Sequence, residues 1–136
     1  MDFGTSESHS KVWSYIDKER MISLAKDLVN IPSATGEEEE CSLFLNDYLE
    51  EIGLDPFLQE VEPRRSNCVA TLKGKGKGAS LLFNGHMDTS YSGKEEFLPK
   101  VKAFQPEAYE EDGWIYGLGI YNMKGALACY IAAMEA

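Results

Sequence analysis

The stretch LLFNGHMDT, residues 81–89, decides the predicted fold of this 136-residue chain. The short apolar run at its start favours a buried β-strand. That strand would end where a glycine is followed by His86 and Asp88, two side chains that a buried strand does not need. In open α/β sheets, ligand sites lie just outside the carboxyl ends of the strands. We therefore expect an α/β fold with His86 and Asp88 at a strand end.

His86 and Asp88 have the spacing that a metal site requires. In an extended segment side chains repeat every second residue, so both point to the same side. A histidine there can bind a metal ion through one nitrogen while the carboxylate holds its other N–H. The alternative is a turn in which His86 is a surface residue and Asp88 caps the next segment. For an isolated His-x-Asp pair this alternative is favoured, because two residues match easily.

A second segment, DGWIYGLGIYNMKG at residues 112–125, changes that weighting. Its Asp-Gly pair predicts a turn, residues 114–116 predict a short strand, and the glycines after them let the backbone bend. From Met123 the apolar pattern becomes helical, which puts Asn122 at a helix start. One face of this helix carries Met123, Leu127, Tyr130, Ile131 and Met134.

Together the two segments resemble the co-catalytic zinc aminoacylase, glutamate carboxypeptidase and acetylornithine deacetylase family of metallopeptidases. That family has an apolar strand into G-H-x-D and, further on, D-G-x-x-Y-G-x-G-x-x-D-M-K-G. The segment IPSATGEE, residues 31–38, also looks like its first helix–loop–helix junction. The resemblance runs from about Arg20 to the last residue. It implies a three-layer α/β/α domain with a mixed sheet, and hydrolysis of an amide bond in N-acyl amino acids or small peptides.

The resemblance also implies roles for three residues. His86 would be a zinc ligand, Asp88 the carboxylate that orients it during catalysis, and position 122 the bridge between two zinc ions, followed by a cis peptide bond. The family has aspartate at the bridge, whereas this chain has Asn122. A carboxamide offers a single neutral oxygen, which is a poor zinc ligand. We therefore expect one zinc ion or none. Alternatively, Asn122 is simply a helix N-cap.

A second departure from the family is length. The family's glutamate pair, a further carboxylate ligand and a final histidine all lie downstream of the segments matched here. We therefore expect residues 11–136 to be the truncated N-terminal part of a catalytic domain and to be inactive alone. The rival interpretation is a non-catalytic homologue, or a binding and assembly domain without zinc chemistry.

Composition excludes some classes of partner. The chain has 13 basic and 23 acidic residues, a net charge of −10, which argues against binding to nucleic acid or an anionic membrane. It has no predicted membrane span or signal peptide, and its three cysteines suggest reduced thiols, so we expect a cytoplasmic protein. We expect a small-molecule or peptide substrate and a homo-oligomer.

The remaining segments give further expectations. Residues 1–10 are predicted to form a polar tail, and residues 11–30 to form helix in one or two pieces. Residues 35–38, TGEE, match a capping box that starts a helix ending near Gly53. Strands are predicted at 57–61 and 67–72. The KGKGKG run at 73–78 fails the phosphate-loop pattern and favours a hairpin loop. Residues 90–112 form a long loop that could face the substrate or a second subunit.

Overall fold

The computed structural model describes residue 11 and residues 13–136, so the predicted tail over residues 1–10 lies outside the described part. Helices and short antiparallel strands alternate along it, which confirms the α/β class. The helical elements are α2 (Lys18–Asn30), α3 (Glu39–Glu51), the 3-10 turn η1 (Lys102–Phe104), the irregular turn η2 (Ile120–Lys124) and α4 (Gly125–Glu135). The strands are β1 (Phe57–Glu62), β2 (Arg65–Val69), β3 (Tyr109–Glu111) and β4 (Trp114–Tyr116).

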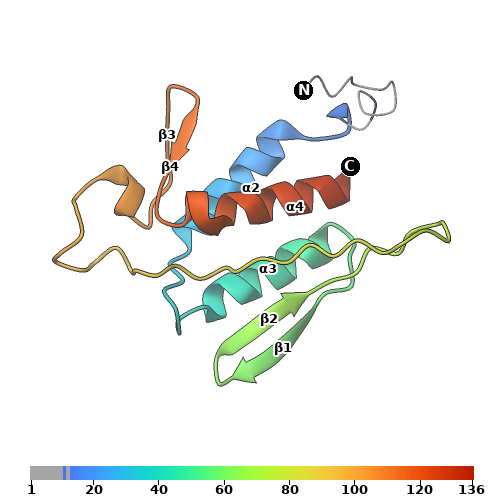
Figure 1. Ribbon diagram of the computed structural model, residues 1–136, viewed down its shortest axis with the longest axis horizontal. Coiled ribbons are helices and arrows are strands. Elements are labelled where there is room, and N and C mark those ends of the chain that lie inside the picture. Colours follow the sequence, from blue (N-terminus) through green and yellow to red (C-terminus); the bar gives the residue numbers. More distant parts are fainter. Residues whose placement is uncertain (1–10, 12) are drawn as a thin grey trace.

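Three helices enclose the hydrophobic core. Helix α2 begins at Asp17, whose carboxylate accepts a hydrogen bond from the backbone N–H of Arg20 at 3.0 Å, as an N-cap does. In Figure 1, α2 and α4 lie side by side and α3 runs beneath them. Their facing stripes of apolar residues bury Leu24, Ala25, Leu28, Cys41, Leu45, Leu49, Ala128 and Ile131. The three cysteines are unpaired, as predicted. No helix of the described part is long and apolar enough to cross a membrane.

The strands form two separate antiparallel pairs. β1 pairs with β2, beside α3, and β3 pairs with β4. The turn between β3 and β4 is the predicted Asp-Gly pair, with φ of 52° at Asp112 and 78° at Gly113. Two left-handed residues in a row are what a tight hairpin needs, because their twist matches that of the flanking strands. The predicted turn and the predicted strand at residues 114–116 are confirmed, whereas β3 and η1 lie within residues 90–112, which were expected to form a loop.

The expected strand at residues 81–83 does not form, and the mixed sheet around it is absent from the described residues. The side chains of Leu81 and Leu82 are 79% and 84% exposed, and no strand is hydrogen-bonded to the segment. Figure 1 shows the chain crossing the face of α3 as an extended, unpaired segment. β2 also stops at Val69, short of the predicted end, so the 73–78 loop does not join two strands. A strand needs a neighbour for its backbone groups, and an apolar run does not supply one.

The capping box predicted at residues 35–38 is also wrong. The N-cap of α3 is Glu38, which makes no side-chain cap bond. The Thr35 hydroxyl donates instead to Oδ2 of Asp88 at 2.6 Å, while the Glu38 carboxylate accepts from the backbone N–H of Gly36 at 2.8 Å. A carboxylate is a stronger acceptor than a neutral group, and it draws the hydroxyl away from the helix start.

Candidate metal centre

Two short segments are clamped together to place His86 and Asp88. Residues 33–35 pair with residues 87–89 through backbone bonds of 3.0 Å (Thr35 N–H to the Thr89 carbonyl) and 2.8 Å (Thr89 N–H to the Ser33 carbonyl). The buried Ser33 hydroxyl adds a bond of 2.7 Å to the carbonyl of Met87. The unpaired segment is thus fixed at its end, where the site lies.

The backbone of residues 85–89 lies close to the start of α4. A Cβ on Gly85 would lie 2.8 Å from side-chain atoms of both Met123 and Leu127. A Cβ on Gly119, where φ is 85°, would lie 2.7 Å from the Thr89 side chain. Glycine at both positions lets the 85–89 segment and the turn before α4 pack against each other.

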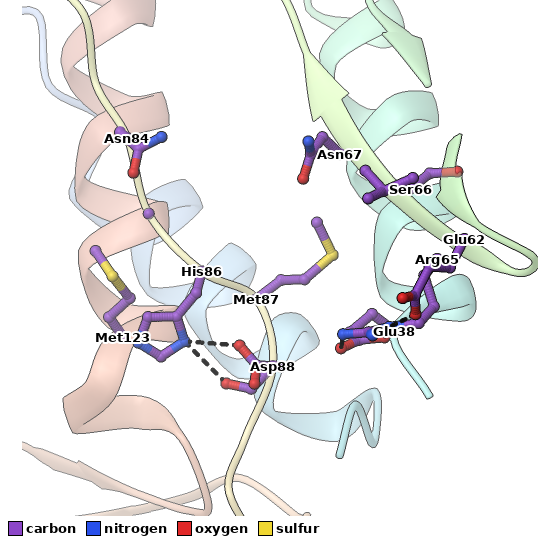
Figure 2. Close-up of a pocket in the computed structure, with 12 residues that line it drawn as sticks. Glu38, Glu62, Arg65, Ser66, Asn67, Asn84, His86, Met87, Asp88 and Met123 are labelled. Atoms are coloured by element: carbon purple, nitrogen blue, oxygen red, sulfur yellow. Dashed lines mark hydrogen bonds and ion pairs between the residues drawn. The ribbon is translucent and has the colours of Figure 1, made fainter. Parts of the chain in front are cut away.

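His86 and Asp88 are in contact, as their spacing predicts. His86 Nδ1 lies 3.1 Å from Asp88 Oδ1 and 3.1 Å from the Asp88 carbonyl oxygen. Both neighbours are acceptors, so Nδ1 contacts them as a donor when it carries the ring proton. Figure 2 shows the His86–Asp88 contact on one wall of a pocket. The two side chains are 46% and 30% exposed, so the pair is open to solvent.

Asn122 meets the other side of the same imidazole. Its Oδ1 lies 3.0 Å from His86 Nε2, although the two residues are 36 positions apart. Asn122 is non-helical (φ −138°, ψ 96°) inside η2, and the Asn122–Met123 peptide bond is cis, as the resemblance implies. The N-cap position of α4 belongs to Lys124, so the interpretation of Asn122 as a helix cap is wrong. Its side chain faces His86 instead.

Lys124 anchors the turn that carries Asn122. Its side chain is 1% exposed, and Nζ donates to the carbonyls of Leu28 and Ile31 at 2.7 Å each. The helical partner of the Leu28 carbonyl would be the N–H of residue 32, but Pro32 has none. Lys124 fills this vacancy at the end of α2, where a cation is also favoured by the helix dipole. Burial lowers the pKa of its ammonium group.

A pocket of about 510 Å³ separates the His86 wall from an ion pair on the opposite wall. There Arg65 binds both carboxylate oxygens of Glu38 at 2.8 Å each and also Glu62 at 2.8 Å (Figure 2). The hydrogen bonds from Arg65 lower the pKa of the buried Glu38 carboxyl to about 2, against the opposing effect of burial. Sequence reasoning missed this pair and the Thr35–Asp88 bond. The TGEE pattern at residues 35–38 indicates helix capping, so it gives no sign of the bonds that Thr35 and Glu38 make instead. A single sequence also does not show which residues far apart in the chain come into contact.

The side-chain atoms that could ligate a metal ion decide how well zinc fits this site. His86 has the arrangement of a zinc ligand, with one nitrogen held by a carboxylate and the other facing the side-chain oxygen of Asn122. The described residues contain no group of three or more histidine, cysteine, aspartate or glutamate side chains able to hold a metal ion. Asn122 is neutral and has one ligating oxygen, so it does not fit as a bridge between two ions. The residues described fit one ligand position of a zinc site and not the two-ion set.

Comparisons with known proteins agree with the motifs. Residues 82–136 match the model of peptidase family M20/M25/M40, a range that takes in the 112–125 motif and all but the first residue of the 81–89 motif. Over 114 residues the chain is 30% identical to succinyl-diaminopimelate desuccinylase of Rickettsia rickettsii (strain Sheila Smith), covering 82% of the chain and 29% of the relative. The protein of the same name from Rickettsia canadensis (strain McKiel) is 32% identical over 115 residues, with the same coverage.

These findings relate the chain to a family of peptidases. More narrowly, the chain belongs to peptidase family M20/M25/M40, as its two motifs indicate. It spans 29% of the length of the curated relatives that it matches.

Proposed function

We propose that this chain supplies the His86–Asp88–Asn122 part of a zinc-dependent amidohydrolase that cleaves N-acyl amino acids or small peptides. The observation that carries the proposal is the imidazole of His86, held at Nδ1 by Asp88 and facing Asn122 through Nε2. Family membership supports hydrolysis as the reaction type. The matched relatives are named desuccinylases, which supports an acyl group on an amine as the substrate feature.

Each of the three residues has a distinct task in this proposal. Asp88 accepts a hydrogen bond from Nδ1–H, which fixes the tautomer and makes Nε2 the ligating atom. Zinc, when bound, would polarise the scissile carbonyl and acidify a water molecule. Asn122 sits beside Nε2 with a neutral oxygen, so the site takes one ion or none. We further propose a cytoplasmic location and a small-molecule or peptide substrate.

The second candidate is a non-catalytic homologue or assembly domain. Asn122 at the bridging position favours it, as does the presence of one imidazole, that of His86, among the described residues. Under either candidate we expect no hydrolysis of N-acyl amino acids by the 136-residue chain alone, because its described residues contain no group of three or more side chains that could hold a metal ion. Zinc-dependent turnover that His86→Ala abolishes would contradict this expectation.

A zinc titration followed by NMR separates the two candidates. The ring nitrogens of His86 and His9, the two histidines of the chain, are observed in ¹⁵N-labelled protein as ZnCl₂ is added. The proposal predicts that His86 responds at lower zinc concentration than His9, through Nε2, and that Asp88→Asn removes this difference. If both rings respond alike in the unaltered chain, the non-catalytic candidate is favoured.

A further inference from the structure

We propose that Thr35 is a positioning residue of this site, which orients Asp88 and, through it, the imidazole of His86. The proposal rests on the proposed function in one respect, namely that His86 is the metal ligand. Thr35 would touch neither metal nor substrate. Its task is to hold the carboxylate that holds the ring.

The two oxygens of the Asp88 carboxylate have separate partners. Oδ1 faces His86 Nδ1 at 3.1 Å, and Oδ2 accepts the hydroxyl proton of Thr35 at 2.6 Å. A carboxylate with one partner can turn about its Cβ–Cγ bond. A second partner on the other oxygen restrains that rotation and keeps Oδ1 aimed at the ring. The Thr35 bond is short, as expected for a hydroxyl that donates to an ionised acceptor.

The direction of proton donation extends this restraint to His86. An ionised carboxylate only accepts, so both of its partners must donate. The hydroxyl of Thr35 donates its single proton to Oδ2, because its other acceptor, the Thr89 carbonyl, lies at 3.4 Å. His86 must then present Nδ1–H to Oδ1. The Nδ1–H of the neutral ring is thereby held toward Asp88, and Nε2 is left on the side of Asn122, whose carboxamide meets a lone pair there by turning its NH₂ group toward the ring.

The backbone around Thr35 fixes where its hydroxyl lies. The Thr35 N–H bonds to the Thr89 carbonyl at 3.0 Å, and a parallel bridge joins Ala34 to Thr89. The bridge sets Thr89 opposite Ala34, so Asp88 and Thr35, each next in the chain to one of these residues, have side chains on the same face and bond there, although the two are 53 positions apart in the sequence. The hydroxyl makes no bond to the start of α3, which leaves the contact with Asp88 as its role.

Three variants test the proposal in the 136-residue chain. Thr35→Val keeps the branched shape but removes the hydroxyl, whereas Thr35→Ser keeps the hydroxyl. Ser33→Ala is the matched control. It removes a second hydroxyl from the pairing between residues 33–35 and 87–89, but this hydroxyl bonds to the Met87 carbonyl and not to Asp88. Thr35 is exposed, so its substitution removes no core packing, and Thr35→Ala gives the same comparison should Thr35→Val fold poorly.

The readouts are the tautomer of the neutral His86 ring, from its two ¹⁵N shifts, and the zinc concentration at which that ring responds. Thr35→Val should reduce the Nδ1–H form and weaken the zinc response roughly tenfold, the lower end for loss of a partner behind a metal ligand. Thr35→Ser should restore both. Ser33→Ala should lower the melting temperature and leave the tautomer unchanged. An unchanged tautomer in Thr35→Val would overturn the proposal.

The two readouts also separate this proposal from the proposed function. If His86 of the unaltered chain shows no preferential zinc response, the metal role fails, and the tautomer comparison alone still decides the role of Thr35. If zinc binds His86 of the unaltered chain and of Thr35→Val equally well, the metal role stands and the positioning role of Thr35 is wrong.

Discussion

Lys124 shows how one buried side chain links helix termination to the candidate site. Pro32 ends α2 and leaves the Leu28 carbonyl without its helical partner. The Lys124 ammonium takes over this carbonyl and that of Ile31, which ties the turn carrying Asn122 to the end of α2. The same residue therefore stabilises the fold and sets the position of Asn122 relative to His86.

We predict that Lys124→Met lowers the free energy of unfolding by about 2–3 kcal/mol, because two carbonyl oxygens in or near the core lose a charged donor. Lys102→Met is the matched control. Lys102 is exposed and pairs with Glu111 at 2.7 Å, so its loss should destabilise the fold much less, because solvent screens an exposed ion pair. Urea unfolding at neutral pH measures both variants. Equal effects of the two substitutions would contradict the anchoring role of Lys124.

The contacts of single residues were predictable only where they are local. His86 and Asp88 are two positions apart, and the geometry of an extended chain brings them together. The approach of Asn122 to His86 was implied by the family resemblance, and no spacing rule predicts it. The Thr35–Asp88 bond spans 53 positions, and the local pattern at Thr35 suggested a helix cap instead. A charged acceptor from elsewhere in the fold overrode that local preference.

The start of α3 and strand β2 are joined by the ion pair of Glu38 and Arg65. Glu38 is buried, and its folded pKa of about 2 lies below its ordinary value of 4.5. A carboxyl with a depressed folded pKa stabilises the fold above its unfolded pKa, and this contribution is lost as pH falls through the folded pKa. The pair therefore stabilises the fold at neutral pH, and this stabilisation is lost in acid as Glu38 becomes protonated.

We predict that the unfolding free energy falls between about pH 4.5 and pH 2 by up to about 3 kcal/mol from this pair. Glu38→Gln should remove that part of the pH dependence. Glu39→Gln, which removes the exposed pair with Arg64, serves as control and should leave it. Urea unfolding at a series of pH values provides the measurement. A Glu38→Gln profile parallel to that of the unaltered chain would disprove the assignment.

Among the elements, helices and hairpin turns were predicted better than strand pairing. Apolar periodicity located α2, α3 and α4 because each buries one stripe of its own residues. The Asp112–Gly113 turn follows from local backbone chemistry. The 81–83 segment has the apolar side chains of a strand, but pairing depends on backbone groups of another segment, and none of the described residues supplies them.

The molecule as a whole exposes an apolar, unpaired segment. Leu81 and Leu82 are largely exposed, and their backbone groups have no strand partner in the described part of the chain. Unpaired strand-like segments and apolar patches both favour self-association. The repulsion of a net charge of −10 acts in the opposite direction. We expect the local apolar contact to prevail at high protein concentration.

We therefore predict that light scattering detects oligomers whose population rises with protein concentration. Leu82→Glu should reduce association by placing a charge on the exposed segment. Leu43→Glu adds the same charge at an exposed position on α3 and should have a smaller effect. A monomer across a wide concentration range, or equal effects of the two substitutions, would show that residues 81–83 are not the contact.

The most direct test of the central claim, that His86 and position 122 form a shared metal-binding pair, is the number of zinc ions bound by Asn122→Asp. The added carboxylate brings a second anionic oxygen and one negative charge beside His86 Nε2. Asn84→Asp, which adds the same charge in the pocket that His86 lines, is the matched control. Zinc per chain is measured by atomic emission after equilibrium dialysis. We predict that, in a full-length context, Asn122→Asp raises it from one or none toward two, while Asn84→Asp leaves it unchanged. Unchanged zinc in Asn122→Asp, with zinc abolished in His86→Ala, would contradict the claim.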